Sequence, residues 1–138
     1  MAERIIFAFL GHLVGDFIFQ TKEMALRKSE KGWKAFWFCT LHVLIYTTSV
    51  AVFTQNFSPL FLLSVSVPHW IIDRYSLASV WLKFIKGRTF DAAYTSTDKY
   101  REFDISFTSI VYTVVDNTFH ILCLVGSLYL DIWLLSKL

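Results

Sequence analysis

Four long apolar stretches constrain this chain more than any other feature of its sequence. They cover approximately residues 5–20, 36–54, 59–82 and 105–135, and most of the charged residues lie between them. A helix needs about 20 apolar residues to cross the hydrocarbon core of a bilayer. With only 17% charged residues, the chain is also less charged than an average soluble domain. We therefore expect a single all-α domain over residues 1–138, an integral membrane four-helix bundle with four crossings.

Basic residues predict the orientation of these crossings. Two connecting stretches, 21–35 and 83–104, each carry five Lys or Arg residues, whereas the connector at 55–59 has no charge. Basic loops remain in the cytosol. We therefore expect a multi-pass protein of the cell (inner) membrane, with its basic stretches inside and both termini outside.

The segment after the third crossing is expected to leave the bilayer. Residues 76–90 place apolar side chains on one face and Lys83, Lys86 and Arg88 on another, which is typical of a helix at a membrane surface. Gly87 is the expected stop of this cytosolic interfacial helix. Residues 89–104 are polar enough to form a solvated loop.

Each predicted crossing contains one of the four histidines: His12, His42, His69 and His120. Three of them have an aspartate four residues away, in the pairs His12 with Asp16, His69 with Asp73, and Asp116 with His120. This interval puts both side chains on one face of a helix. The order of the pair reverses in the outward-running fourth crossing, so all three aspartates lie on the cytosolic side of their partners. At about 1.5 Å per residue, all seven groups fall about 7 to 22 Å from the cytosolic ends, so they can meet at one site.

Aspartates within a membrane require compensating cations, because a charged residue at the bilayer centre costs about 2.5 to 3.5 kcal/mol on insertion scales. Arg74 is the only Lys or Arg within the first three crossings. A divalent metal neutralises several carboxylates and accepts neutral imidazole. We therefore expect one or two ions of zinc, manganese or iron. The candidate ligands are His12, His42, His69, His120, Asp16, Asp73 and Asp116, and the three aspartates are also the candidate catalytic residues.

Four further residues have two interpretations each. Gln20 extends the stripe of His12 and Asp16 and is a candidate substrate-binding residue, or a polar residue at a helix end. Arg74 is the second candidate for substrate binding, as a clamp for an anionic group, or a side chain that reaches toward lipid headgroups. Cys39 and Cys123 each lie three residues from a histidine, a spacing that suits metal ligation or simple apolar packing.

The stretch GHLVGDFIFQ, with His12, Asp16, Phe17 and Gln20, has the pattern H-L-x-x-D-F-x-x-Q. Together with HWIID at 69–73 and DNTFH at 116–120, it resembles a small family of bacterial and phage multi-pass membrane proteins of unknown function. The resemblance implies a compact helical membrane protein. In residue types alone, the sequence is also similar in style to membrane-bound metal-dependent hydrolases.

These features favour an intramembrane metal-dependent hydrolase that acts from the cytosolic side on a lipid-linked or small amphipathic substrate within the lipid bilayer. One alternative is a divalent-metal or proton transporter that uses the same His and Asp residues and requires a homo-oligomer. The other is a structural membrane subunit whose His–Asp contacts only join helices. The basic residues lie in predicted loops, and we expect no nucleic-acid binding.

Overall fold

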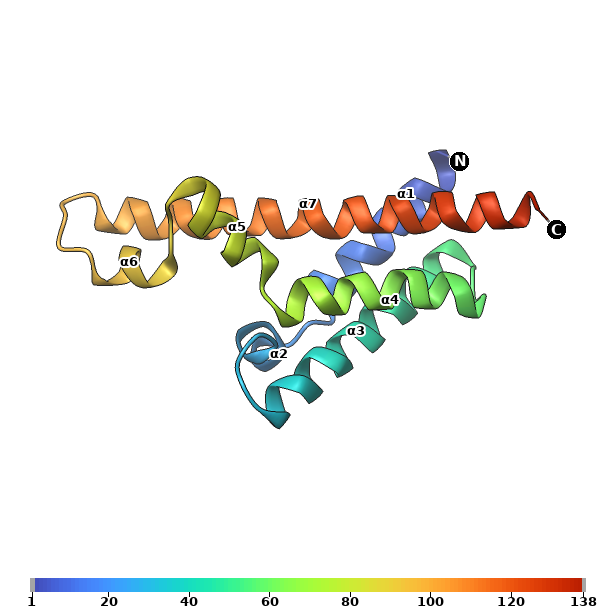
Figure 1. Ribbon diagram of the computed structural model, residues 1–138, viewed down its shortest axis with the longest axis horizontal. Coiled ribbons are helices and arrows are strands. Elements are labelled where there is room, and N and C mark those ends of the chain that lie inside the picture. Colours follow the sequence, from blue (N-terminus) through green and yellow to red (C-terminus); the bar gives the residue numbers. More distant parts are fainter. Residues whose placement is uncertain (1, 138) are drawn as a thin grey trace.

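The computed structural model describes residues 2–137, and this part of the chain is all-helical, with 82% helix and no strand. The elements in chain order are α1 (Ala2–Leu13), η1 (Val14–Ile18), α2 (Lys22–Arg27), α3 (Trp33–Thr54), α4 (Pro59–Arg74), α5 (Leu77–Lys86), α6 (Phe90–Thr95) and α7 (Arg101–Leu135) (Figure 1). The prediction of an all-α chain is confirmed.

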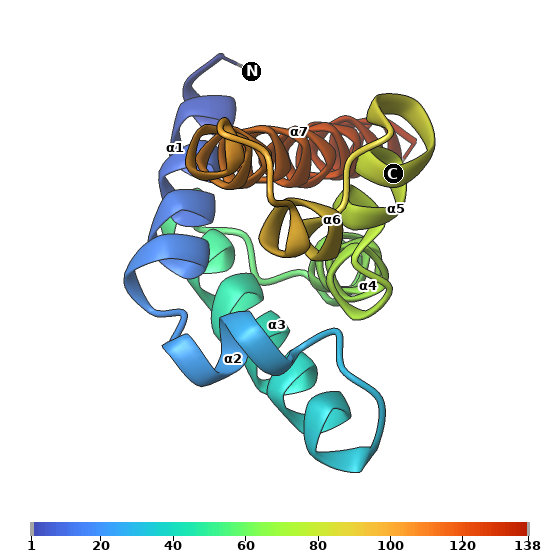
Figure 2. The same ribbon diagram turned by 90° about the vertical axis from the view of Figure 1, so that its left-hand side faces the viewer.

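Four helices form the body of the structure. In the order α1, α3, α4, α7 each helix packs against the next, and α7 packs against α1, which closes a ring (Figure 2). The start of α1, the end of α7 and the α3–α4 connector share one end of this ring, which we call the terminal end (Figure 1). The segments α2, α5 and α6 lie toward the other end, which we call the basic end. Lys83 and Lys86 of α5 lie at the basic end.

Two glycines allow α1 and η1 to approach α3 closely. A Cβ added at Gly11 would lie 2.8 Å from Cα of Val50, and one added at Gly15 would lie 2.9 Å from Cα of Tyr46. The hydroxyl of Ser49 also donates to the carbonyl oxygen of Gly11 at 2.9 Å. Small residues four apart are a common means of packing membrane helices. The spacing of the two glycines is thus the sequence signal for this contact.

The first predicted crossing, 5–20, is not one regular α-helix. After Leu13 the chain widens into the π-helical turn η1, and the amide of Phe19 donates to the carbonyl of Val14 at 3.0 Å. Such turns occur mostly as single insertions within α-helices, often at functional sites. Here the wide turn carries Asp16.

A proline within α4 explains a contact between α4 and α7. Pro68 has no amide hydrogen, so the carbonyl of Ser64, one turn earlier, loses its usual helical donor. The hydroxyl of Ser127 in α7 lies 2.7 Å from this oxygen and donates to it. The missing bond of one helix therefore becomes a bond between two helices.

The third predicted crossing, 59–82, is divided into two helices. The helix α4 ends at Arg74, Ser76 adopts a left-handed conformation with φ 45°, and α5 begins at Leu77. The end of α4 is anchored to the connector before α3, because Arg74 donates to the carbonyl oxygen of Glu30 at 2.6 Å. The helix α5 lies within residues 76–90, where a helix was predicted, and ends, as expected, at Gly87, with φ 60°.

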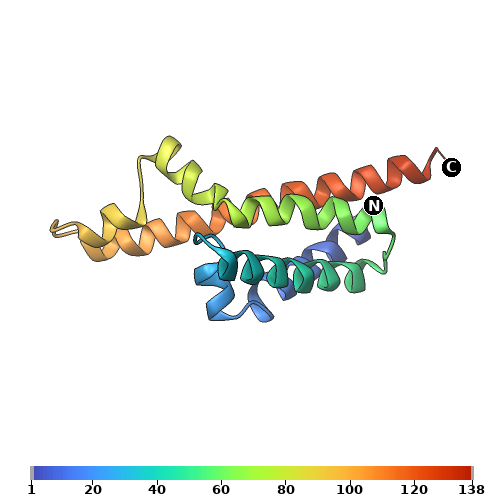
Figure 3. The ribbon, with the colours of Figure 1, turned by 60° about the horizontal axis from the view of Figure 1, so that its bottom comes forward.

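The predicted loop 89–104 contains more helix than expected. The hydroxyl of Thr89 accepts a hydrogen bond from the amide of Ala92 at 3.1 Å and caps α6, and α7 already begins at Arg101. Figure 3 shows α5 and α6 beside the first part of α7, beyond the end of the ring. Packing against α7 thus orders a segment whose composition is that of a loop.

Two helices in the described part of the chain are long and apolar enough to cross a membrane, α3 over Trp33–Thr54 and α7 over Arg101–Leu134. Large apolar side chains are exposed on the outer faces of all four ring helices. They include Ile6, Phe9 and Leu10 of α1, Leu41, Leu44 and Val52 of α3, Leu60, Leu63 and Val67 of α4, and Ile110, Val114 and Leu122 of α7.

Candidate functional site

The interior of the ring contains the chain's four histidines. His12 comes from α1, His42 from α3, His69 from α4 and His120 from α7, and each is at most 2% exposed. The three predicted aspartates surround them at ion-pair distances. The structure therefore brings all seven predicted metal-ligand candidates into one cluster.

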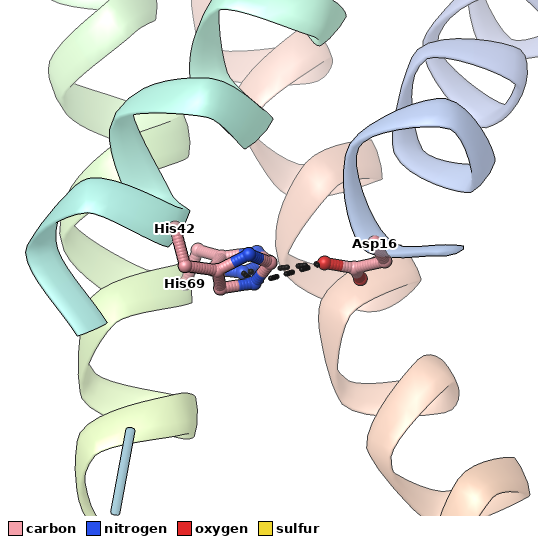
Figure 4. A group of neighbouring side chains, drawn as sticks. All are labelled: Asp16, His42 and His69. Atoms are coloured by element: carbon pink, nitrogen blue, oxygen red, sulfur yellow. Dashed lines mark hydrogen bonds and ion pairs between the residues drawn. The ribbon is translucent and has the colours of Figure 1, made fainter. Parts of the chain in front are cut away.

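The tightest part of the cluster, which we call the ligand group, consists of Asp16, His42, His69 and Asp73. The two Nε2 atoms of His42 and His69 lie 3.1 Å apart. Oδ1 of Asp16 lies 3.2 Å from Nε2 of His42 and 3.6 Å from Nε2 of His69 (Figure 4). Oδ2 of Asp73 lies 3.1 Å and 3.2 Å from the same two nitrogens.

These distances fit a metal centre. With bonds of 2.0–2.1 Å, two ligand atoms of a tetrahedral zinc ion stand about 3.4 Å apart. Oδ1 of Asp16 and Oδ2 of Asp73 are buried and make no hydrogen bond of good geometry, although both lie beside imidazole nitrogens. Buried polar atoms normally have partners. A cation beside the imidazole nitrogens would supply such a partner.

His120 extends the group on the α7 side. Its Nδ1 lies 2.8 Å from the backbone carbonyl of Asp116 and must donate to it, since a carbonyl only accepts. In a neutral ring this leaves the lone pair on Nε2, which is 3.5 Å from Oδ1 of Asp73 and has no hydrogen-bond partner. His69, Asp73 and His120 thus form a second possible set of three ligands.

His12 lies behind Asp16 rather than within the ligand group. Its Nδ1 is 3.2 Å from Oδ2 of Asp16, and its Nε2 is 2.9 Å from Oδ1 of Asn117. The amide of Asn117 donates to the carbonyl of Thr113 at 2.7 Å, which fixes Oδ1 as the acceptor from His12. In a neutral ring Nδ1 then carries no hydrogen and makes no hydrogen bond, so His12 contacts the carboxylate of Asp16 without donating to it.

Lys28 joins the cluster although our sequence interpretation placed it only in a basic cytosolic stretch. It is 8% exposed, and its Nζ donates to Oδ1 of Asp73 at 2.7 Å. Burial opposes its charge, but the neighbouring carboxylates, Asp73 first, outweigh this and raise the pKa of Lys28 above its usual value. The one local signal for the burial of Lys28 is its spacing of four from Met24, the other buried residue in and just after α2.

Lys28 offsets one negative charge of the cluster but leaves the cluster negatively charged. The cluster contains the carboxylates of Asp16, Asp73 and Asp116 and one ammonium group. With neutral imidazoles its formal charge is therefore two units negative. One divalent cation would neutralise it.

Of the remaining predicted site residues, only one lies at the site. Gln20 lies at the site, with its Nε2 3.1 Å from Nε2 of His42. Arg74 donates to the carbonyls of Lys28 and Glu30 and does not line the cleft beside the ligand group. Neither Cys39 nor Cys123 belongs to the metal-ligand sets found among the described residues.

A polar cleft connects the cluster with the basic end. Its volume is about 150 Å³, and it is lined by Asp16, Phe17, Gln20, Ala25, Lys28, Tyr112, Thr113, Asp116 and Asn117. Carboxylate, amide, ammonium and phenol groups therefore face one small space beside the ligand group.

An apolar core closes the other side of the cluster. It consists of Ala8, Tyr46, Val50, Phe61, Val65, Leu124 and Leu128, packed by Ile5. Each core residue is four or eight positions from the histidine of its own helix, always toward the terminal end. These intervals are one and two helical turns, so the core lies directly beyond the histidines.

The family described as "Protein of unknown function (DUF3307)" matches residues 5–137. The chain belongs to this family. A search of curated proteins and a search of solved structures each found no match. Membership of the family thus agrees with the predicted resemblance to a family of unknown function, and the site geometry carries the functional argument.

Proposed function

We propose that this member of the family is an intramembrane metal-dependent hydrolase. The observation that carries the proposal is that Asp16, His42 and His69, from η1, α3 and α4, place one ligand atom each within 4.8 Å of one another. Oδ2 of Asp73 also lies 3.1 Å and 3.2 Å from the two imidazole nitrogens. His120 would be either a further ligand of the ion or a general base beside it. The ion would be zinc, manganese or iron. The two possible ligand sets overlap at His69, and because one imidazole nitrogen binds one ion, a second ion would need a ligand other than that nitrogen.

In this proposal α1 with η1, α3, α4 and α7 each cross the cell (inner) membrane. The apolar outer faces and the polar interior of the ring support it, because soluble proteins expose charge and membrane proteins turn it inward. At about 1.5 Å per residue, the 16 residues of α4 extend about 24 Å, so the bilayer thins beside it. The basic end faces the cytosol and both termini face outward.

The proposed chemistry divides among the residues of the cluster. A divalent ion held by the ligand group would polarise a substrate oxygen and lower the pKa of a bound water toward about 7. Asp116 lines the cleft, and its buried Oδ1 has no hydrogen-bond partner, which suits a proton acceptor. Lys28 and Gln20 present donors to the same space, where they would orient a polar group and stabilise negative charge.

The volume of the cleft also limits the size of the substrate group that can enter it. Its volume of about 150 Å³ is enough for a reacting group but not for a whole lipid. The rest of a lipid-linked or small amphipathic substrate would remain among lipids or in the cytosol. The cleft opens toward the basic end, so the substrate would enter from the cytosolic side.

The apolar core favours hydrolysis over transport. A transporter needs a polar route from the ligand group to both membrane surfaces. Here Phe61, Val65, Leu124 and Leu128 fill the interior between the histidines and the terminal end. Access from one side suits an enzyme.

Elemental mass spectrometry of protein purified without a polyhistidine tag tests the proposal. We expect one or two equivalents of metal per chain, lost in His69→Ala and in Asp16→Asn. Asp131→Asn is the matched control, because Asp131 is a buried carboxylate at the terminal end that accepts from Asn56 at 2.9 Å. Absence of metal after anaerobic reloading would overturn the proposal. With metal bound, a panel of esters, phosphoesters and amides identifies the bond that is cleaved.

A further inference from the structure

A second cavity lies apart from the polar cleft, between η1 and the outer face of α3. This groove has a volume of about 440 Å³ and is lined by Val14, Phe19, Leu44, Ile45, Thr48, Ser49, Val52 and Phe53. It shares no lining residue with the cleft. The π-helical turn forms one of its walls, because the hydrogen bond from Phe19 to Val14 closes the turn between two of its lining residues.

The groove offers almost nothing to a polar ligand. Its only side-chain hydroxyls belong to Thr48 and Ser49. Thr48 donates to the carbonyl of Leu44 at 2.8 Å, and Ser49 donates to the carbonyl of Gly11 at 2.9 Å. Each hydroxyl has one hydrogen, so no side-chain donor in the groove remains free. An occupant therefore meets a hydrocarbon surface.

The position of the groove indicates its occupant. It lies along the second half of α3, one of the two helices long and apolar enough to cross a membrane. Leu44 is 59% exposed and Val52 is 48% exposed, so the groove opens outward, away from the ring interior. Its volume lies within the range of about 300 to 1,000 Å³ typical of ligand pockets. At this depth the surrounding medium supplies hydrocarbon chains.

We propose that the groove is a binding site for one acyl chain of a membrane phospholipid. The inference rests on the membrane insertion included in the proposed function, but on neither metal nor catalysis. The groove differs from an ordinary lipid-facing surface because it is concave and bounded on two sides by η1 and α3. A chain within it would exchange more slowly than the lipids around the flat outer face of α4.

Photolabelling tests this site. The protein would be reconstituted into vesicles of phosphatidylethanolamine and phosphatidylglycerol that contain a trace of phosphatidylglycerol with a diazirine midway along one acyl chain. After illumination, labelled residues are mapped by peptide mass spectrometry. We expect several-fold more label at Leu44 and Val52 than at Leu63 and Val67 of α4, which are comparably exposed.

Two variants that fill space make the test specific. Thr48→Trp should remove the excess label from the groove, and Val52→Phe should reduce it with less risk to folding. Leu63→Trp, on the outer face of α4, is the control and should leave the groove labelled. Equal labelling of α3 and α4, or an excess that persists in both groove variants, would overturn the inference. Absence of label from every helix would contradict membrane insertion itself, whereas loss of metal alone would leave the labelling pattern unchanged.

Discussion

The ammonium of Lys28 and the carboxylate of Asp73 meet at 2.7 Å inside the structure, although 45 residues separate them in the chain. One oxygen of Asp73 accepts from Lys28, and the other faces the imidazoles of His42 and His69. A single carboxylate thus joins the basic connector before α3 to the proposed metal ligands. Lys28 balances one of the negative charges that the proposed ion would otherwise meet.

This ion pair predicts a stability difference that depends on metal. Lys28→Met leaves the buried carboxylate of Asp73 without its cation, a loss of about 3 to 5 kcal/mol when one partner of a buried pair is removed. A divalent ion would recover part of this loss. We expect Lys28→Met to lower the thermal unfolding temperature of metal-free protein far more than that of metal-loaded protein, as followed by tryptophan fluorescence. Lys31→Met, at an exposed position, should change neither, and equal losses in both forms would contradict a role of Lys28 at the site.

His12 and His69 should differ in their effect on metal binding. His69 faces two aspartates directly, whereas His12 contacts the second oxygen of Asp16 and Asn117. Loss of a side chain that contacts a metal ligand typically weakens metal affinity about 10- to 100-fold. We expect His12→Ala to bind metal at saturating concentration with this reduced affinity, and His69→Ala to lose the ion. Competition with a chelator measures both, and equal behaviour would place His12 among the ligands.

The contact of α1 and η1 with α3 should tolerate no added methyl group. Gly11→Ala and Gly15→Ala each force a Cβ to within 3.0 Å of a Cα of α3, and overpacking of this kind costs about 1 to 3 kcal/mol. Gly126→Ala is the matched control in α7, because a Cβ there meets nothing within 4 Å. It should be neutral or stabilising by up to about 1 kcal/mol, as alanine favours helices. Unfolding curves in mild detergent compare the three, and unchanged stability in both test variants would refute the close approach.

The bond between Ser127 and the carbonyl of Ser64 predicts coupling with Pro68. Ser127→Ala should cost about 1 kcal/mol in the natural background, because the carbonyl loses its donor from α7. In a Pro68→Ala background the restored amide at position 68 can donate to the same carbonyl, and the cost should fall. A double-mutant cycle of unfolding free energies measures this coupling. Additive effects would show that the two residues act independently.

The spacing of His12 with Asp16 and of His69 with Asp73 could be read from sequence because polar residues stand out within apolar helices. The role of Lys28 could not be read from sequence, because residues 21–35 contain four other Lys or Arg residues. Only tertiary packing distinguishes Lys28 from them. The end of α5 was predictable because glycine favours the left-handed conformation of Gly87. The break before α5 was not, because Ser76 adopts the same conformation without a local signature.

The one-sided closure of the ring has a kinetic consequence. If the protein is the proposed hydrolase and the cleft beside Asp16 and Asp116 is the only polar approach within residues 2–137, substrate and product would use the same opening. The cleft volume of about 150 Å³ would admit one reacting group at a time. Departure of the product then precedes every new turnover. Added product should therefore inhibit competitively, raising the apparent KM and leaving the maximal rate unchanged.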